Sequence, residues 1–131
     1  MKKQILLPPS ILRELRETFK VGRNDLRRAL NYERNSDRAI TLRRAALERG
    51  GLIYTGIKAP QGYIPPVETK FDAGTMYQFL GNRVELRLNK ETNEARIIID
   101  SIEIAKFNDM TTESWGDVLY SLQQIYNQLN A

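Results

Sequence analysis

The 131-residue sequence contains no cysteine and no histidine. Without these side chains the chain cannot form a disulfide framework, a Cys/His zinc site, a cysteine nucleophile or a Ser-His-Asp triad. It also has no glycine-rich loop of the kind that cradles phosphates. Only carboxylate, lysine or tyrosine chemistry remains for an enzyme, so we expect a protein that is not an enzyme and needs no cofactor. Asp100 and Glu103 are close in sequence, but with no basic or metal-binding cluster nearby we interpret them as edge or surface charges.

Long apolar runs are also missing. No stretch approaches the ~18 apolar residues that cross a bilayer, and the apolar part of the N-terminal segment is shorter than the ~7–15 residues of a signal-peptide core. A hydrophobic content of 41% with mixed charge favours a folded chain over a disordered one. We therefore expect a cytoplasmic protein with one domain or two small ones.

The charges are divided unevenly along the chain. Residues 1–58 contain fourteen Lys and Arg against six Asp and Glu, a net charge of +8. Residues 59–131 contain six against ten, a net charge of −4. This division indicates a nucleic-acid-binding part joined to a part that avoids nucleic acid. The alternative is a basic helical surface with no special purpose.

Helical periodicity predicts three short helices in the basic half. We expect the first over 11–19 with Ser10 as its N-cap, the second over about 23–30, and the third from Ser36, also an N-cap, to the glycines at 50 and 51. The residues expected to be buried are Ile11, Leu12, Leu15 and Phe19 in the first helix, Leu26, Ala29 and Leu30 in the second, and Ala39, Leu42 and Ala46 in the third, where Ile40 and Leu47 are further candidates.

The acidic half changes to a period of two. Residues 52–55 could add a short strand to the helices, and the proline- and glycine-rich stretch 56–74 is typical of a linker. Alternation then predicts strands near 75–80, 84–88, 95–99 and 102–107, followed by a helix over 112–129. The predicted fold is α+β: a three-helix domain (1–55), a linker (56–74), and an antiparallel meander of three or four strands with an amphipathic helix (75–131).

The last helix has an apolar stripe that would cover one face of this sheet. Because apolar residues lie on the other sheet face as well, a second copy of the chain is the simplest cover, which predicts a dimer or higher oligomer. Trp115 and Tyr126 fit core or interface positions better than stacking platforms. The expected interface residues are Ile98, Ile102, Ile104, Trp115, Leu119, Leu122 and Tyr126.

Residues 11–51 resemble the helix-turn-helix headpiece of the lac-repressor and phage-repressor class. The matching features are Leu12 and Leu15, the Val21-Gly22 turn, the 23–31 helix, Ser36, and the Ala45-Ala46-Leu47 core. The resemblance implies that the second helix enters a DNA major groove, with Arg23, Asn24 and Arg28 reaching base edges. It departs at Arg16 and at Lys20, where the class prefers a small residue and a turn glycine. Nothing after residue 55 resembles the sugar-binding domain of the lac-repressor type.

The side-chain chemistry agrees with this resemblance. Arginine can donate two hydrogen bonds to guanine, and asparagine can pair in the same bidentate way with adenine. Residues near helix ends and in the loop are expected to contact phosphates, namely Ser10, Lys20, Arg27, Arg34, Ser36 and Arg38. Arg27 and Arg38 could instead make contacts within the chain, and Tyr32 could either pack under the third helix or touch a phosphate.

The sequence therefore predicts a sequence-specific double-stranded DNA-binding protein, a homo-oligomeric and repressor-like transcriptional regulator of phage or mobile-element type. The alternative is an adaptor that attaches to DNA non-specifically through its basic part. Its acidic part would then bind another protein in recombination, replication or packaging. Whether a small-molecule effector binds is left open.

Overall fold

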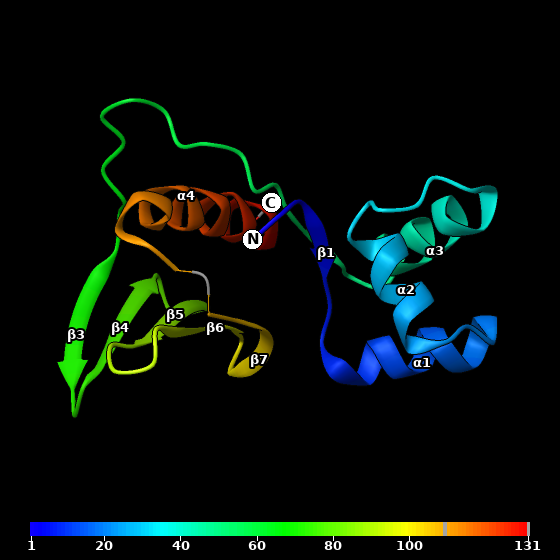
Figure 1. Cartoon of the computed structure of the whole chain (residues 1–131), viewed down its shortest axis with the longest axis horizontal. Helices are drawn as coiled ribbons and strands as arrows, with labels where there is room; N and C mark the ends of the chain where they lie inside the picture. Colours follow the sequence, from blue (N-terminus) through cyan, green and yellow to red (C-terminus); the bar gives the residue numbers. More distant parts are fainter. Residues whose placement is uncertain (109, 131) are drawn as a thin grey trace. The chain divides into compact units, whose positions relative to one another are not determined.

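A computed structural model describes residues 1–108 and 110–130. In this part of the chain it contains four helices and two antiparallel sheets, which confirms the α+β class (Figure 1). The chain divides into two compact units, Lys2–Thr55 and Gly56–Ala131, the second grouped with Met1. None of the helices described is long and apolar enough to cross a membrane.

The N-terminal unit packs three helices with a two-stranded sheet. Its elements are β1 (Gln4–Leu6), α1 (Pro9–Phe19), α2 (Arg23–Leu30), α3 (Asp37–Glu48) and β2 (Leu52–Tyr54). The predicted short strand near 52–55 pairs antiparallel with β1, a strand that the sequence had not indicated. Ile5 and Leu7, from β1 and the residues after it, complete a core built mainly from the helices: Leu15, Val21, Leu26, Ala29, Leu30, Ala39, Leu42, Ala45 and Ala46.

The helix boundaries correct one predicted cap and confirm the other. Helix α1 begins at Pro9 with Pro8 in the N-cap position, so Ser10 lies in the first turn and caps nothing. Proline fits the first helical position because its missing N–H would have had no partner there and its φ is already near helical. Ser36 does cap α3, where its Oγ accepts a hydrogen bond from the Ala39 N–H at 3.2 Å.

The predicted buried face of α3 is too wide. Ile40 and Leu47, the two further candidates for this face, are 43% and 41% exposed and do not belong to it. Side chains step around a helix by about 100° per residue, and Ile40 lies one such step beyond the buried Ala39. Leu42 and Ala46 fall back onto the packed side and are buried.

The turn between α1 and α2 has a left-handed residue at Lys20, with φ 50° and ψ 48°. The next residue, Val21, is buried in the core, and Gly22 occupies the N-cap position of α2. Arg38 of α3 holds this turn, because its guanidinium donates to the Phe19 and Lys20 carbonyl oxygens at 3.1 and 3.3 Å. The turn therefore has the backbone shape that glycine normally supplies, but it is formed by a lysine.

Replacing Lys20 with glycine is expected to stabilise the protein. A left-handed conformation costs a residue with a Cβ roughly 1–2 kcal/mol, part of which is offset by the greater freedom of glycine in the unfolded chain. We expect Lys20→Gly to raise the free energy of unfolding by about 0.5–1 kcal/mol, measured by urea denaturation followed by helical circular dichroism. As a control, Glu17→Gly inside α1 should lower it by about the same amount. If both variants lowered the free energy of unfolding equally, the left-handed conformation of Lys20 would be contradicted.

The C-terminal unit is a five-stranded antiparallel meander with the order β3-β4-β5-β6-β7. The strands are β3 (Glu68–Asp72), β4 (Thr75–Leu80), β5 (Val84–Asn89), β6 (Glu94–Ile99) and β7 (Ile102–Phe107). The prediction of three or four strands fell short because β3 lies in the stretch interpreted as a linker. Every residue of β3 is exposed, so it lacks the alternation that reveals a strand in a sequence.

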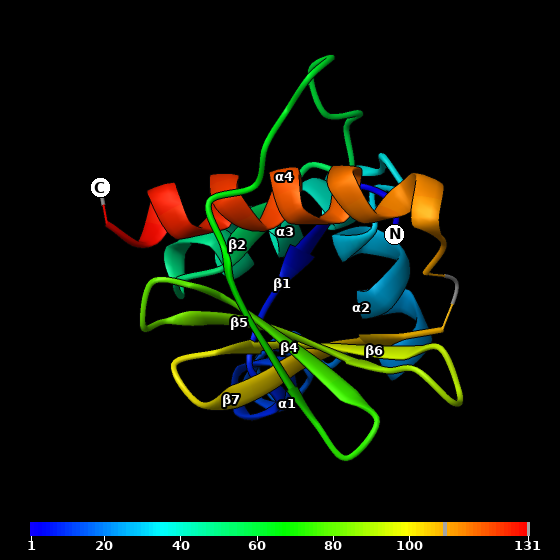
Figure 2. The ribbon, with the colours of Figure 1, turned by 90° about the vertical axis from the view of Figure 1, so that its left-hand side faces the viewer.

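Helix α4 (Thr112–Leu129) lies across one face of this sheet (Figure 2). Its own buried residues face a sheet side on which Leu86 and Ile97 of the central strands are also buried. Leu119 and Leu122 are 1% and 0% exposed within the single chain, so they belong to its core and have no surface to offer a second copy. Their assignment to an oligomer interface is therefore corrected.

The segment between β2 and β3 is not a free linker. The Gly56 N–H donates to Ser121 Oγ at 3.2 Å, and the Ala59 N–H donates to Asp117 Oδ1 at 2.7 Å. The Tyr63 hydroxyl donates to Gln123 Oε1, and its ring meets that of Tyr120 edge-on at 5.1 Å. These contacts hold the segment on α4, which makes it part of the C-terminal unit.

The second face of the sheet is mixed rather than continuously apolar. It carries the half-buried rings of Tyr77 and Phe79, stacked with their centres 6.4 Å apart, and the buried Ile98. Charged residues lie on the same face, where Arg96 bonds to Glu94 at 2.8 Å and to Glu103 at 3.2 Å. Lys106 lies 3.3 Å from the same Glu94, and the hydrogen bond from Arg96 lowers the pKa of that carboxyl group. This face is therefore not the continuous apolar surface from which a second copy was expected.

Candidate nucleic-acid interface

Helix α2 is held to the N-terminal unit by one side only. Leu26, Ala29 and Leu30 are at most 3% exposed and fix the helix in the core. On the other side Arg23 and Asn24 are exposed, and Arg28 is half-buried. The three residues predicted to reach base edges therefore share the solvent side of α2.

The polar side chains of α2 are not used by the protein itself. Within the part of the chain that the structure describes, the side chains of Arg23, Asn24, Arg27 and Arg28 form no hydrogen bond or ion pair. Arg27 and Arg28 lie in the last turn, where a cation is favourable to the helix dipole. Arg23 lies at the first position, where a cation is unfavourable. Local helix stability therefore does not explain why an arginine stands there.

The residues predicted to contact phosphates fall into two groups. Lys20 and Arg34 are exposed, and the described residues give their side chains no partner, as for Arg27. Ser10 is exposed in the first turn of α1. Ser36 and Arg38 have structural roles. Ser36 caps α3, and Arg38 donates hydrogen bonds to the α1–α2 turn. For Arg38 the contact within the chain, one of the two readings left open, is present.

Sequence reasoning missed that two further arginines hold the fold together. Arg43 donates to the Ala29 carbonyl at 2.9 Å and to the Arg34 carbonyl at 2.7 Å, which ties the α2–α3 loop to α3. Arg49 pairs with Glu14 at 3.0 Å and joins the end of α3 to α1. The positive charge of the N-terminal unit is therefore partly structural, and no local pattern distinguishes these arginines from the free ones.

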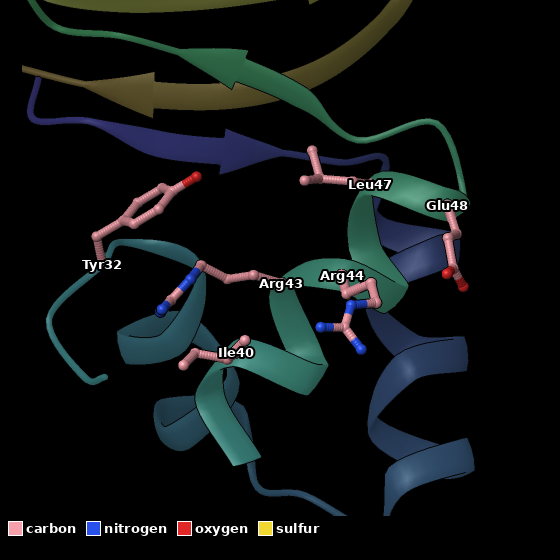
Figure 3. Close-up of a pocket in the computed structure, with 6 residues that line it drawn as sticks. All are labelled: Tyr32, Ile40, Arg43, Arg44, Leu47 and Glu48. Atoms are coloured by element: carbon pink, nitrogen blue, oxygen red, sulfur yellow. The ribbon is translucent and has the colours of Figure 1, made fainter. Parts of the chain in front are cut away.

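Tyr32 is a packing residue. Lys3 Nζ lies 4.3 Å and the Arg43 guanidinium 4.8 Å from the centre of its ring, which packs against the core of the unit. It also borders an open hollow, whose other lining residues come from α3 (Figure 3): Ile40, Arg43, Arg44, Leu47 and Glu48. Two cation–π contacts within the N-terminal unit fit the packing reading of Tyr32.

The acidic residues considered for catalysis are paired with arginines. Asp100 accepts two hydrogen bonds from Arg83 at 2.8 Å, and these bonds lower the pKa of its carboxyl group. Glu103 pairs with Arg96. Among the residues described, no group of three or more acidic side chains is placed to hold a metal ion. Among the described residues, the exposed side of α2 is thus a surface whose arginines and asparagine have no structural role.

No protein-family model, curated protein or solved structure matches this chain.

Proposed function

We propose that this protein binds double-stranded DNA in a sequence-specific manner, with α2 as the recognition helix of a helix-turn-helix. We further propose that it acts as a homo-oligomeric, repressor-like regulator of phage or mobile-element type. Its copies would associate through the C-terminal unit, so that two α2 helices read two half-sites.

The observation that carries this proposal is the free polar side of α2. Arginine and asparagine offer the two bidentate donor patterns that best distinguish guanine and adenine in the major groove. Here they stand on a helix whose opposite side is buried, so the side chains are presented from a rigid support. Lys20 adds support, because its left-handed φ gives the turn the shape that the helix-turn-helix class obtains from glycine.

The alternative is an adaptor that holds DNA without reading its sequence. The excess of free cations in the N-terminal unit would serve this role equally well, because phosphate contacts are independent of sequence. The two functions differ in specificity and in the dependence of binding on salt.

Selection of bound duplexes from a random pool tests the proposal directly. With the 131-residue chain at physiological salt, we expect one motif to be enriched, with two half-sites separated by about one helical turn or a multiple of it. The selected duplex should bind at least ~10³-fold more tightly than an unrelated one. No enriched motif, together with steep salt dependence on every duplex, would overturn sequence-specific recognition and favour the adaptor.

A further inference from the structure

The sheet of the C-terminal unit has two open edges, formed by β3 and β7 (Figure 1). An edge strand presents unpaired backbone N–H and C=O groups, and another strand can hydrogen-bond to them. On β7, Ile102 is 45% exposed, although its partner across the ladder, Ile99, is buried. The β7 edge therefore combines free backbone groups with exposed apolar surface.

A bulge at Ile104 gives β7 an unusual distribution of side chains. The ladder pairs Ile97 with Ala105 but Ile98 with Glu103, which leaves Ile104 as the extra residue. As a result Ile102 and Phe107, at opposite ends of the strand, lie on the same face as the buried residues that they oppose, Ile99 and Ala95. In a strand of six residues without a bulge the two ends would point to opposite faces.

This distribution makes β7 complementary to a second copy of itself. An antiparallel pairing of two β7 strands over their full length sets Ile102 opposite Phe107 of the other copy. The same register sets Glu103 opposite Lys106 of the other copy, twice across the two-fold axis. Glu103 and Lys106 lie on the polar face of the sheet, with side chains 44% and 55% exposed. Apolar residues thus meet on one face and opposite charges on the other.

The other edge lacks this property. Pairing two β3 strands over all five residues would set Lys70 opposite Lys70 and Glu68 opposite Asp72, and like charges in opposing positions are destabilising. Pairing β3 of one copy with β7 of the next would be a head-to-tail contact, which leaves an open edge at each end and tends towards filaments. Of these three pairings, β7 with β7 in full register is the one that is both closed and electrostatically favourable.

The geometry points to an antiparallel β7–β7 pairing between two copies, which joins their sheets into one ten-stranded sheet. This inference rests on the self-association in the proposed function and specifies the interface. Of the residues predicted from the sequence for the interface, this pairing retains Ile102 and Ile104 and does not require Leu119 or Leu122.

Two single charge reversals test the register. Glu103→Lys should set like charges opposite each other in a homodimer, and so should Lys106→Glu. We expect each variant alone to show a dimer dissociation constant raised about tenfold or more, measured by sedimentation equilibrium without DNA. Mixing the two variants should restore the dimer, because each reversed residue then opposes a residue of opposite charge. Any disturbance of Arg96 or Glu94 within one chain is the same alone and in the mixture, so recovery reports the contact between copies.

Lys70→Glu on β3 is the matched control and should leave the dimer mass unchanged. Disulfide trapping adds a measurement that leaves both apolar positions intact. Because the chain has no cysteine of its own, Glu103→Cys and Lys106→Cys chains should form a covalent dimer when mixed and oxidised, whereas either chain alone should not. A monomeric wild-type chain would overturn the pairing, since an edge bulge can also shield a sheet from association. Single variants that remain dimeric, or a mixture that gives neither recovery nor a disulfide, would also overturn it.

The mass measurement and the duplex selection fail independently. Loss of the β7 contact with an enriched DNA motif retained would remove the interface and keep the DNA-binding proposal. An intact dimer with no enriched motif would keep the β7 interface and remove the proposal of sequence-specific DNA binding.

Discussion

The double variant Arg23→Ala/Asn24→Ala is expected to lose sequence-specific DNA binding while retaining its fold. Each bidentate contact contributes roughly 1–3 kcal/mol of base discrimination. Loss of both should therefore raise the Kd for the selected duplex by about 30-fold to 10,000-fold. Binding to unrelated duplexes should weaken much less, because only one cation is removed. Fluorescence anisotropy at a fixed salt concentration with the selected and an unrelated duplex measures both effects.

Arg44→Ala is the matched control for charge. Arg44 is exposed on α3, and the described residues give its side chain no hydrogen bond or ion pair. Its loss should weaken binding to all duplexes to a similar, small extent. If the double variant also weakened binding to every duplex by the same factor, α2 would hold phosphates and base readout would be wrong.

Leu122→Ala is expected to lower the free energy of unfolding of the C-terminal unit by about 2–5 kcal/mol. Leu122 is fully buried between α4 and the sheet, so truncation removes buried apolar surface and leaves a cavity. The single tryptophan, Trp115, lies on α4, and its fluorescence during urea denaturation reports on this unit.

Asn127→Ala serves as the control for Leu122→Ala, because Asn127 is exposed on the same helix and its truncation should change the free energy of unfolding by less than about 0.5 kcal/mol. If Leu122→Ala left the free energy of unfolding unchanged but weakened the dimer, Leu122 would lie in the interface between copies and not in the core.

The sequence determined the elements whose two sides differ in polarity. Alternation located β4 to β7, and the apolar spacing of Leu26, Ala29 and Leu30 located α2 together with its buried side. Strand β3 was missed because all its side chains are exposed, and β1 because its pairing partner β2 is distant in the chain. Strand β1 pairs with β2, which is distant in the chain, and β3 pairs with β4 across a turn. The local periodicity of a segment does not record which strand it pairs with.

The candidate interface shows the same division. Residue types and helical spacing were enough to place Arg23, Asn24 and Arg28 on the outer side of α2. The sequence did not show which arginines are free, because no local pattern distinguishes Arg38, Arg43 and Arg49 from the arginines without a partner. Their role depends on backbone carbonyls and a carboxylate that are brought near only by packing α3 against α1 and α2.

By itself, then, the sequence determined the α+β class, the charge asymmetry and the sides of the helices, since these follow from the order of residue types along the chain. The tertiary structure alone decided that α4 buries Leu119 and Leu122 and that ion pairs lie beside aromatic rings on the second sheet face. It also decided that a bulge places Ile102 and Phe107 on one face. These features depend on which strand or helix lies opposite each residue, and that depends on contacts between segments far apart in the chain.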